Sequence, residues 1–112
     1  MTQSVPELNT KRGGLEESVL MCPACGFDFM HQCGVEVFVR ETEDADHGQH
    51  VEVDYRDSVD FGNGVSTDDG NPSGRRDGIK LKFWCEECQN ENNPYELIIQ
   101  QHKGLEHVFW KY

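Results

Sequence analysis

Two Cys-x-x-Cys pairs constrain this 112-residue chain more than any other feature. The first is Cys22-Pro-Ala-Cys25, which is followed by Gly26, and the second is Cys85-Glu-Glu-Cys88. Two residues between cysteines suit a knuckle turn in which both thiolates bind one tetrahedral Zn²⁺ at ~2.3 Å, and a glycine lets such a turn close. A redox pair is the alternative, but the β-α-β pattern that surrounds thioredoxin-like pairs is absent from the sequence. The spacing therefore predicts one structural zinc ion.

Four cysteine ligands leave no coordination position for a catalytic water, so the predicted site stabilises the fold. Only 36% of the residues are hydrophobic, against an apolar share of ~45–50% in ordinary globular chains. A chain with so little core material is expected to depend on its metal. The sequence contains no nucleophile elbow and no glycine-rich phosphate loop, which predicts that the protein is not an enzyme.

Alternation of apolar and polar residues predicts antiparallel strands, and no segment has a helical period. The expected strands are residues 31–40, 50–56, 79–84, 95–101 and 106–112, with a hairpin turn at 102–104. The predicted fold class is therefore mainly β, with about five strands around one zinc. We expect a flexible N-terminal arm over residues 1–20 and a single domain over 21–112.

The two knuckles and the strands beside them resemble the zinc-ribbon family, small β-domains in which two knuckles share one zinc. The resemblance covers about half of the chain and rests on its four paired cysteines. Cys25 and Cys85 are separated by 59 residues, which is longer than the interval in compact ribbons, so residues 41–78 are interpreted as an insertion. The chain also resembles small uncharacterised zinc-ribbon proteins of phages and other mobile elements.

The formal charge of −11 is concentrated in this insertion, because residues 41–70 carry ten acids and one base. A strongly acidic chain is a poor candidate for binding nucleic acid mainly by electrostatics. We expect the acidic surface to face a basic protein partner. A solvated loop and a Ca²⁺ site are the alternatives, although the EF-hand order of ligands is absent. The acidic surface comprises Glu41, Glu43, Asp44, Asp46, Asp54, Asp57, Asp60, Asp68 and Asp69.

Residues 57–78 are rich in Asp, Gly, Asn, Ser and Pro. Such a composition buries little apolar surface to offset the entropy of ordering, which predicts a mobile loop. The end of this segment and the strand after it carry the one locally basic and aromatic patch, formed by Arg75, Arg76, Lys80, Lys82 and Trp84. Because zinc ribbons commonly dock nucleic acids or proteins, the resemblance makes this patch the basis of an alternative function, nucleic-acid binding. Its simpler interpretation is a set of solvated cations over an apolar sheet face.

Cys33 is expected to be a small packed residue, and the pair His47 and His50 is a weak candidate for a second metal site. The sequence has no apolar run near the ~20 residues of a membrane span and no signal sequence. Together with an odd cysteine count, this predicts a soluble protein of the reducing cytoplasm.

Overall fold

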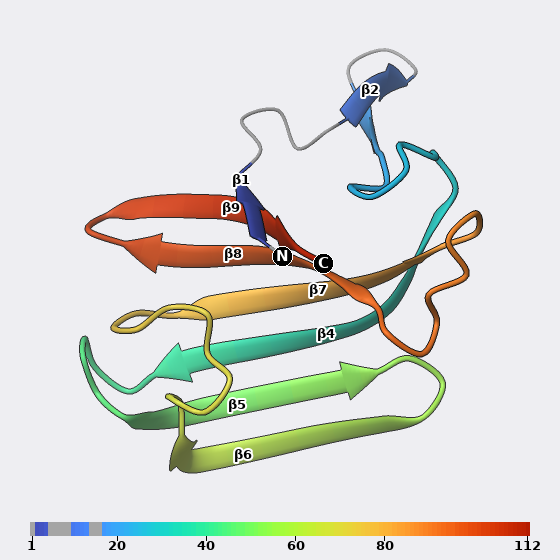
Figure 1. Ribbon diagram of the computed structural model, residues 1–112. Coiled ribbons are helices and arrows are strands. Elements are labelled where there is room, and N and C mark those ends of the chain that lie inside the picture. The colour runs from blue at the N-terminus through green and yellow to red at the C-terminus, as the bar shows by residue number, and fades with distance from the viewer. Residues whose placement is uncertain (1, 5–9, 14–16) are drawn as a thin grey trace.

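The computed structural model describes residues 2–4, 10–13 and 17–112, and all regular structure in these ranges is β-strand (Figure 1). No helix in the described part of the chain is long and apolar enough to cross a membrane. The prediction of a mainly antiparallel β fold is confirmed. The strands are β1 (Thr2–Ser4), β2 (Thr10–Gly13), β3 (Glu17–Leu20), β4 (Met30–Arg40), β5 (His47–Asp54), β6 (Ser58–Ser66), β7 (Gly78–Cys85), β8 (Tyr95–His102) and β9 (Leu105–Lys111).

Seven of these strands form one sheet in the order β1-β9-β8-β7-β4-β5-β6, and every neighbouring pair is antiparallel. Strands β2 and β3 pair with each other in a separate hairpin, which lies at the top of Figure 1, away from β5 and β6. The central pair is β7 and β4, so the second knuckle at the end of β7 is adjacent to the start of β4, where Met30 pairs with Cys85.

The five predicted strands correspond to β4, β5, β7, β8 and β9, with ends that differ by a few residues at most. The predicted hairpin turn between β8 and β9 is also confirmed. Lys103 and Gly104 have φ values of 52° and 80°, the pair of left-handed residues that a tight two-residue hairpin turn requires.

Strand β6 corrects the prediction of a mobile loop over residues 57–78. Residues 58–66 pair along β5, from Asp54 with Ser58 to His47 with Ser66. Of these nine residues only Gly62 is not exposed. The strand is therefore held by its backbone ladder and not by burial of its own side chains, which is why composition does not reveal it. The acidic insertion accordingly extends the sheet by two strands.

The predicted flexible arm over residues 1–20 is only partly covered by the structure. Residues 1, 5–9 and 14–16 lie outside the described residues. Within the arm, Thr2–Ser4 pairs with β9 at one edge of the sheet, and Thr10–Gly13 pairs with Glu17–Leu20. The described parts of this segment are therefore strands, which the lack of periodicity in the sequence does not indicate.

Side chains alternate between two faces of the sheet, and each face has its own small core. On the face that carries Leu81, Val35 and Val53, which we call the apolar face, the buried cluster is Phe83, Leu97 and Trp110. The rings of Phe83 and Trp110 meet edge-to-face, with centroids 5.7 Å apart, and Leu20 and Met30 pack against the cluster. This core lies next to the two knuckles and so supports them.

The opposite face, which we call the charged face, has its core at the far end of the sheet, under the segment 67–77. Phe38 and Ile98 are buried there, and Gly70 in that segment lies over the Phe38 ring. The side chain of Arg40 is only 2% exposed, and its guanidinium donates to the backbone carbonyls of Ala45, Ser73 and Arg76. A buried cation with several acceptors thus orders a loop that has little apolar surface.

Candidate metal centre

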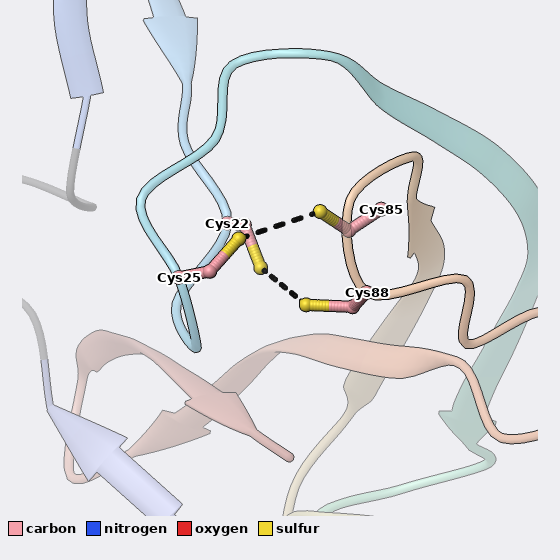
Figure 2. A group of neighbouring side chains, drawn as sticks. All are labelled: Cys22, Cys25, Cys85 and Cys88. Atoms are coloured by element: carbon pink, nitrogen blue, oxygen red, sulfur yellow. Dashed lines mark hydrogen bonds between the residues drawn. The ribbon is translucent and has the colours of Figure 1, made fainter.

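The four paired cysteines meet at the knuckle end of the sheet. Cys22 and Cys25 lie in the turn between β3 and β4, whereas Cys85 ends β7 and Cys88 lies in the turn that follows (Figure 2). Their sulfur atoms all lie within 4.8 Å of one another. Two turns that are far apart in the sequence therefore present four sulfur atoms to one point, as the spacing predicts.

The distances between sulfur atoms match the size of a metal site. The Cys22 and Cys88 Sγ atoms are 3.8 Å apart, and those of Cys25 and Cys85 are 3.6 Å apart. A tetrahedron with a metal–sulfur distance of ~2.3 Å has edges of ~3.8 Å, whereas a disulfide brings its sulfurs to ~2.05 Å. None of the five cysteines forms a disulfide. The four sulfurs can therefore bind one metal ion, and their geometry does not support the disulfide alternative.

The two knuckles share one backbone design. The amide of Gly26 donates to the carbonyl of Cys22 at 2.9 Å, and the amide of Gln89 donates to that of Cys85 at 2.8 Å. Gly26 has φ 80° and Gln89 has φ 53°, so the residue after each pair is left-handed. Glycine adopts this conformation at little cost, whereas other residues are strained in it. The predicted role of Gly26 is confirmed, and the second knuckle makes the same turn without glycine.

Two residues that the sequence analysis did not single out support the second knuckle. The Asn90 side chain accepts from the Cys85 amide at 2.7 Å and donates to the carbonyls of Phe83 and Asn93. Hydrogen bonding to Cys88 and burial raise the pKa of Tyr95 above its usual value, so the hydroxyl of Tyr95 lies against a ligand sulfur. Neither residue belongs to a recognisable motif, and only the fold brings them to the site.

The Cys22 thiol is buried, and its burial raises its pKa to about 12. Because a thiol must lose its proton to bind a metal, this sulfur is neutral at pH 7 without an ion and becomes a thiolate when a cation balances its charge. The pKa of Cys85 is lowered instead, because its burial is outweighed by hydrogen bonds from the backbone of Cys88 and Glu87 and from the neighbouring thiols.

Within the ranges that the structure covers, these cysteines form the only group of three or more His, Cys, Asp or Glu ligands around one point. The candidate Ca²⁺ site in the acidic segment is thus not formed by the described residues. His50 instead bonds to Glu36 at 2.8 Å, and His47 pairs with Glu41 and Asp46, so the two histidines do not build a second site. Cys33 is half-buried and lies outside the cluster.

The two arginines of the predicted basic patch are engaged with the acidic segment. Arg75 donates from Nε and Nη2 to the two carboxylate oxygens of Asp44, at 2.5 and 2.9 Å. This pairing lowers the pKa of Asp44 below its usual value. Arg76 pairs with Glu43 and Asp44. Two of the five patch residues therefore have their charge balanced within the chain.

The other three members of the patch are also occupied. Lys82 lies 3.8 Å from carboxylate oxygens of Glu36 and of Glu52. Lys80 lies over the Phe38 ring, 5.8 Å from its centroid. The indole of Trp84 stacks on the ring of His31, with centroids 4.3 Å apart and an interplanar angle of 16°. The patch does not present a free row of cations beside an open aromatic ring.

The nine acidic residues of the predicted surface divide between the two ends of the sheet. Asp54, Asp57 and Asp60 lie on the β5–β6 hairpin at the knuckle end. The other six lie at the far end, ~26 Å away by the length of β5. At the far end Arg40, Arg75 and Arg76 balance part of the charge, and Arg40 Nη1 donates to Asp68 Oδ1 at 2.6 Å. The far-end residues are Glu41, Glu43, Asp44, Asp46, Asp68 and Asp69.

Comparison of the chain with protein-family models, with curated proteins and with solved structures finds no significant match. The likeness to a zinc ribbon therefore rests on the cysteine cluster and the antiparallel strands that carry it. What the comparisons and the structure together establish is a β-sheet domain with a four-cysteine site of the size that binds a metal ion.

Proposed function

We propose that the cysteine cluster binds one structural Zn²⁺, as in a zinc ribbon, and that the protein works as a small interaction module. Four cysteine sulfurs in a tetrahedral arrangement are the donor set of structural zinc sites. The S···S distances of 3.6 and 3.8 Å between the knuckles are the observation that supports this best. With four protein ligands there is no open position for a substrate, so we assign the ion a structural role and propose no catalytic activity.

The knuckle end of the sheet is the proposed docking surface. Asp54, Asp57 and Asp60 are exposed, and none of them has a side-chain hydrogen bond or ion pair among the described residues. Four thiolates with one Zn²⁺ add a net charge of −2 at the same end, and Glu86 and Glu87 lie between the second pair of cysteines. This end is therefore more acidic than the far end, where arginines balance the carboxylates.

The proposed docking surface contains a groove with a volume of about 630 Å³. Four carboxylates, from Glu52, Asp54, Glu91 and Glu96, line it with two lysines. Tyr95 and Tyr112 are also among the residues that line it. Carboxylates beside aromatic rings suit an arginine or lysine side chain, which gains both ion pairing and cation–π contact. We propose that a basic segment of a partner protein docks here, steered by the acidic field.

The alternative, nucleic-acid binding through Arg75, Arg76, Lys80, Lys82 and Trp84, receives less support. A phosphate backbone would have to compete with Asp44 for Arg75 and with Glu36 for Lys82. It would also meet the −11 charge of the chain. We therefore propose a basic protein, and not a nucleic acid, as the partner.

The compartment that suits this proposal is a reducing one, because ligand thiols must stay free of disulfides to bind zinc. We accordingly propose an intracellular location. The resemblance to phage and mobile-element proteins is consistent with a small regulatory partner of this kind, and it remains a proposal about origin.

A binding assay with matched charge variants tests the docking surface. The zinc-loaded chain is titrated into a fluorescent oligolysine peptide at low salt. Changing Asp54, Asp57 and Asp60 together to asparagine should weaken binding roughly tenfold or more. The control removes the same number of charges at the far end (Glu41→Gln, Asp46→Asn and Asp69→Asn) and should weaken binding about threefold at most. Equal losses would contradict the proposed surface, and so would tight binding of DNA or RNA at moderate salt.

A further inference from the structure

Two unbroken rows of apolar side chains cross the apolar face of the sheet. The register places Leu81, Val35, Val53 and Val59 directly opposite one another on β7, β4, β5 and β6. A second row lies two residues further along each strand. It consists of Ile79, Val37, Val51 and Phe61 on the same four strands. Cross-strand rows of this kind normally face a second layer of structure, because a sheet must bury its hydrophobic face.

Among the residues that the structure describes, no second layer covers these rows. At the edge strand β6, Val59 is 71% exposed and Phe61 is 63% exposed. The four valines of β4 and β5 in these rows are only half-buried. Among the described strands, the extensive contacts of β4, β5 and β6 are all with their neighbours in the sheet. The segment 67–77 does not cover these rows, because it lies on the charged face over Phe38.

The described N-terminal strands lie away from the edge of this area at β6. Ser4 is anchored to Phe109 on β9, and β9 lies five strand spacings, or ~24 Å, from β6. The β2–β3 hairpin lies at the knuckle end, away from β5 and β6 (Figure 1).

Charge is strictly divided between the faces of these four strands. The apolar face of these strands carries no Asp, Glu, Lys or Arg. The remaining positions in register are Phe83, Gln32, Val39, Gln49 and Asn63, with His47 opposite Ser66 at the far end, where His47 pairs with Glu41 and Asp46. The charged face of the same strands carries Glu36, Glu52, Asp60, Lys80 and Lys82. Stacking two apolar faces would therefore keep the carboxylates of both molecules on the outside, with two sheets between them.

We infer that a second copy of this chain covers the apolar face, so that two sheets pack face to face about a twofold axis. Two identical uncharged faces are self-complementary, which is the requirement for such an interface, and sheets pack in this way at ~10 Å. The apolar face of the four strands measures roughly 19 by 23 Å. Summed over the two molecules, the projected area of contact is about 900 Å². This is near the ~1,000 Å² at which specific interfaces begin, and it predicts a dimer that forms at micromolar concentration.

Sedimentation equilibrium of the zinc-loaded full chain tests this inference. We expect a mass of twice 12.8 kDa at about 200 µM protein, well above a micromolar Kd. Screening reduces repulsion between the acidic molecules, so added salt should strengthen the dimer. The proposed contact with a basic partner should weaken with salt. Because the two interactions respond to salt in opposite directions, each proposal can fail without the other.

Paired variants on β6 identify the face involved. Val59→Lys and Phe61→Lys each place a charge on the apolar face, and each should weaken dimerisation roughly tenfold or more. Ser58→Lys and Asp60→Asn change the charge equally on the opposite face and should leave the dimer intact. All four positions are exposed, so the monomer fold should survive, which a thermal melt checks. A wild-type monomer at the highest concentration would overturn the inference, and so would a dimer that persists in Phe61→Lys.

Discussion

Arg40 Nη1 lies 2.6 Å from Asp68 Oδ1, and this contact joins the last residue of β4 to the loop that follows β6. The same guanidinium donates to the backbone of residues in both far-end connections, at Ala45 and Ser73. One buried cation therefore organises the end of the sheet that has the least apolar material, while the four-cysteine cluster joins the two knuckles at the other end. The two ends should respond independently to mutation.

Replacing Arg40 with methionine should loosen the far end. Methionine fills a similar volume but leaves the carbonyls of Ala45, Ser73 and Arg76 without a donor, which should cost about 2–4 kcal/mol of stability. Urea unfolding measures the loss, and amide exchange should rise in residues 67–77. Arg75→Met is the control, because Arg75 is exposed and its pairing with Asp44 should contribute little to stability. Equal effects of the two changes would contradict the role given to Arg40.

Replacing Gln89 with glycine should stabilise the protein. Gln89 has φ 53°, a left-handed conformation that costs a residue with a Cβ roughly 1–2 kcal/mol. Glycine avoids that strain but gains freedom in the unfolded chain, so the net gain should be about 1 kcal/mol. The reciprocal change, Gly26→Ala, should destabilise by a similar amount, since Gly26 has φ 80°. Thermal melts of the zinc-loaded proteins provide the comparison, and a lower midpoint for Gln89→Gly would contradict this account.

The protonation of His47 should depend on its acidic neighbours. A hydrogen bond with Asp46 and the charge of Glu41 raise the pKa of His47 above its usual 6.5. Because the folded-state pKa is the higher one, the stabilisation is fully present below about pH 6.5 and disappears as the pH rises through the folded value. NMR titration should show a raised pKa in the wild type and a lower one in Asp46→Asn. A wild-type pKa below that of the variant would contradict the assignment.

Replacing Cys85 with serine should weaken metal binding and strongly destabilise the domain. The three remaining sulfurs bind the ion more weakly, and a zinc site of this kind contributes on the order of 10 kcal/mol to folding in small domains. Cys33→Ser is the matched control, because Cys33 lies outside the cluster and its loss should leave zinc content unchanged. Circular dichroism and metal analysis on both variants check this. A folded, zinc-loaded Cys85→Ser protein would show that Cys85 is not a ligand.

The metal site was predictable because it is a local pattern repeated twice, and its spacing alone requires the two turns to meet. The strands that carry β-branched residues in alternation were predictable for the same reason. Strand β6 was not, since its residues contribute backbone pairing and almost no burial. Arg40 was not identified either: its position at the end of an alternating strand is ordinary, and its role depends on loops that fold back over it. Asn90 and Tyr95 likewise acquire their roles only through tertiary contacts.

The pattern of charges located the acidic residues along the chain correctly, but it did not predict which of them lie close together in the structure. The net charge of −9 over residues 41–70 suggested one acidic surface, yet the antiparallel hairpin β5–β6 carries Asp57 to one end of the sheet and Asp46 to the other. The prediction of a basic patch was misleading for the same reason, because Arg75 and Arg76 pair with Asp44 across the far-end loops. A sequence locates charges along the chain, whereas strand direction decides which of them meet.

Metal analysis of the purified protein tests the central claim most directly. After gel filtration in a buffer without added metal, the folded chain should contain one zinc per molecule, bound by Cys22, Cys25, Cys85 and Cys88. Removal of the ion by a chelator should separate the two knuckles and lower the thermal midpoint of unfolding. Adding back one equivalent of Zn²⁺ should restore the midpoint. A chain that is folded, monodisperse and free of metal would contradict the account.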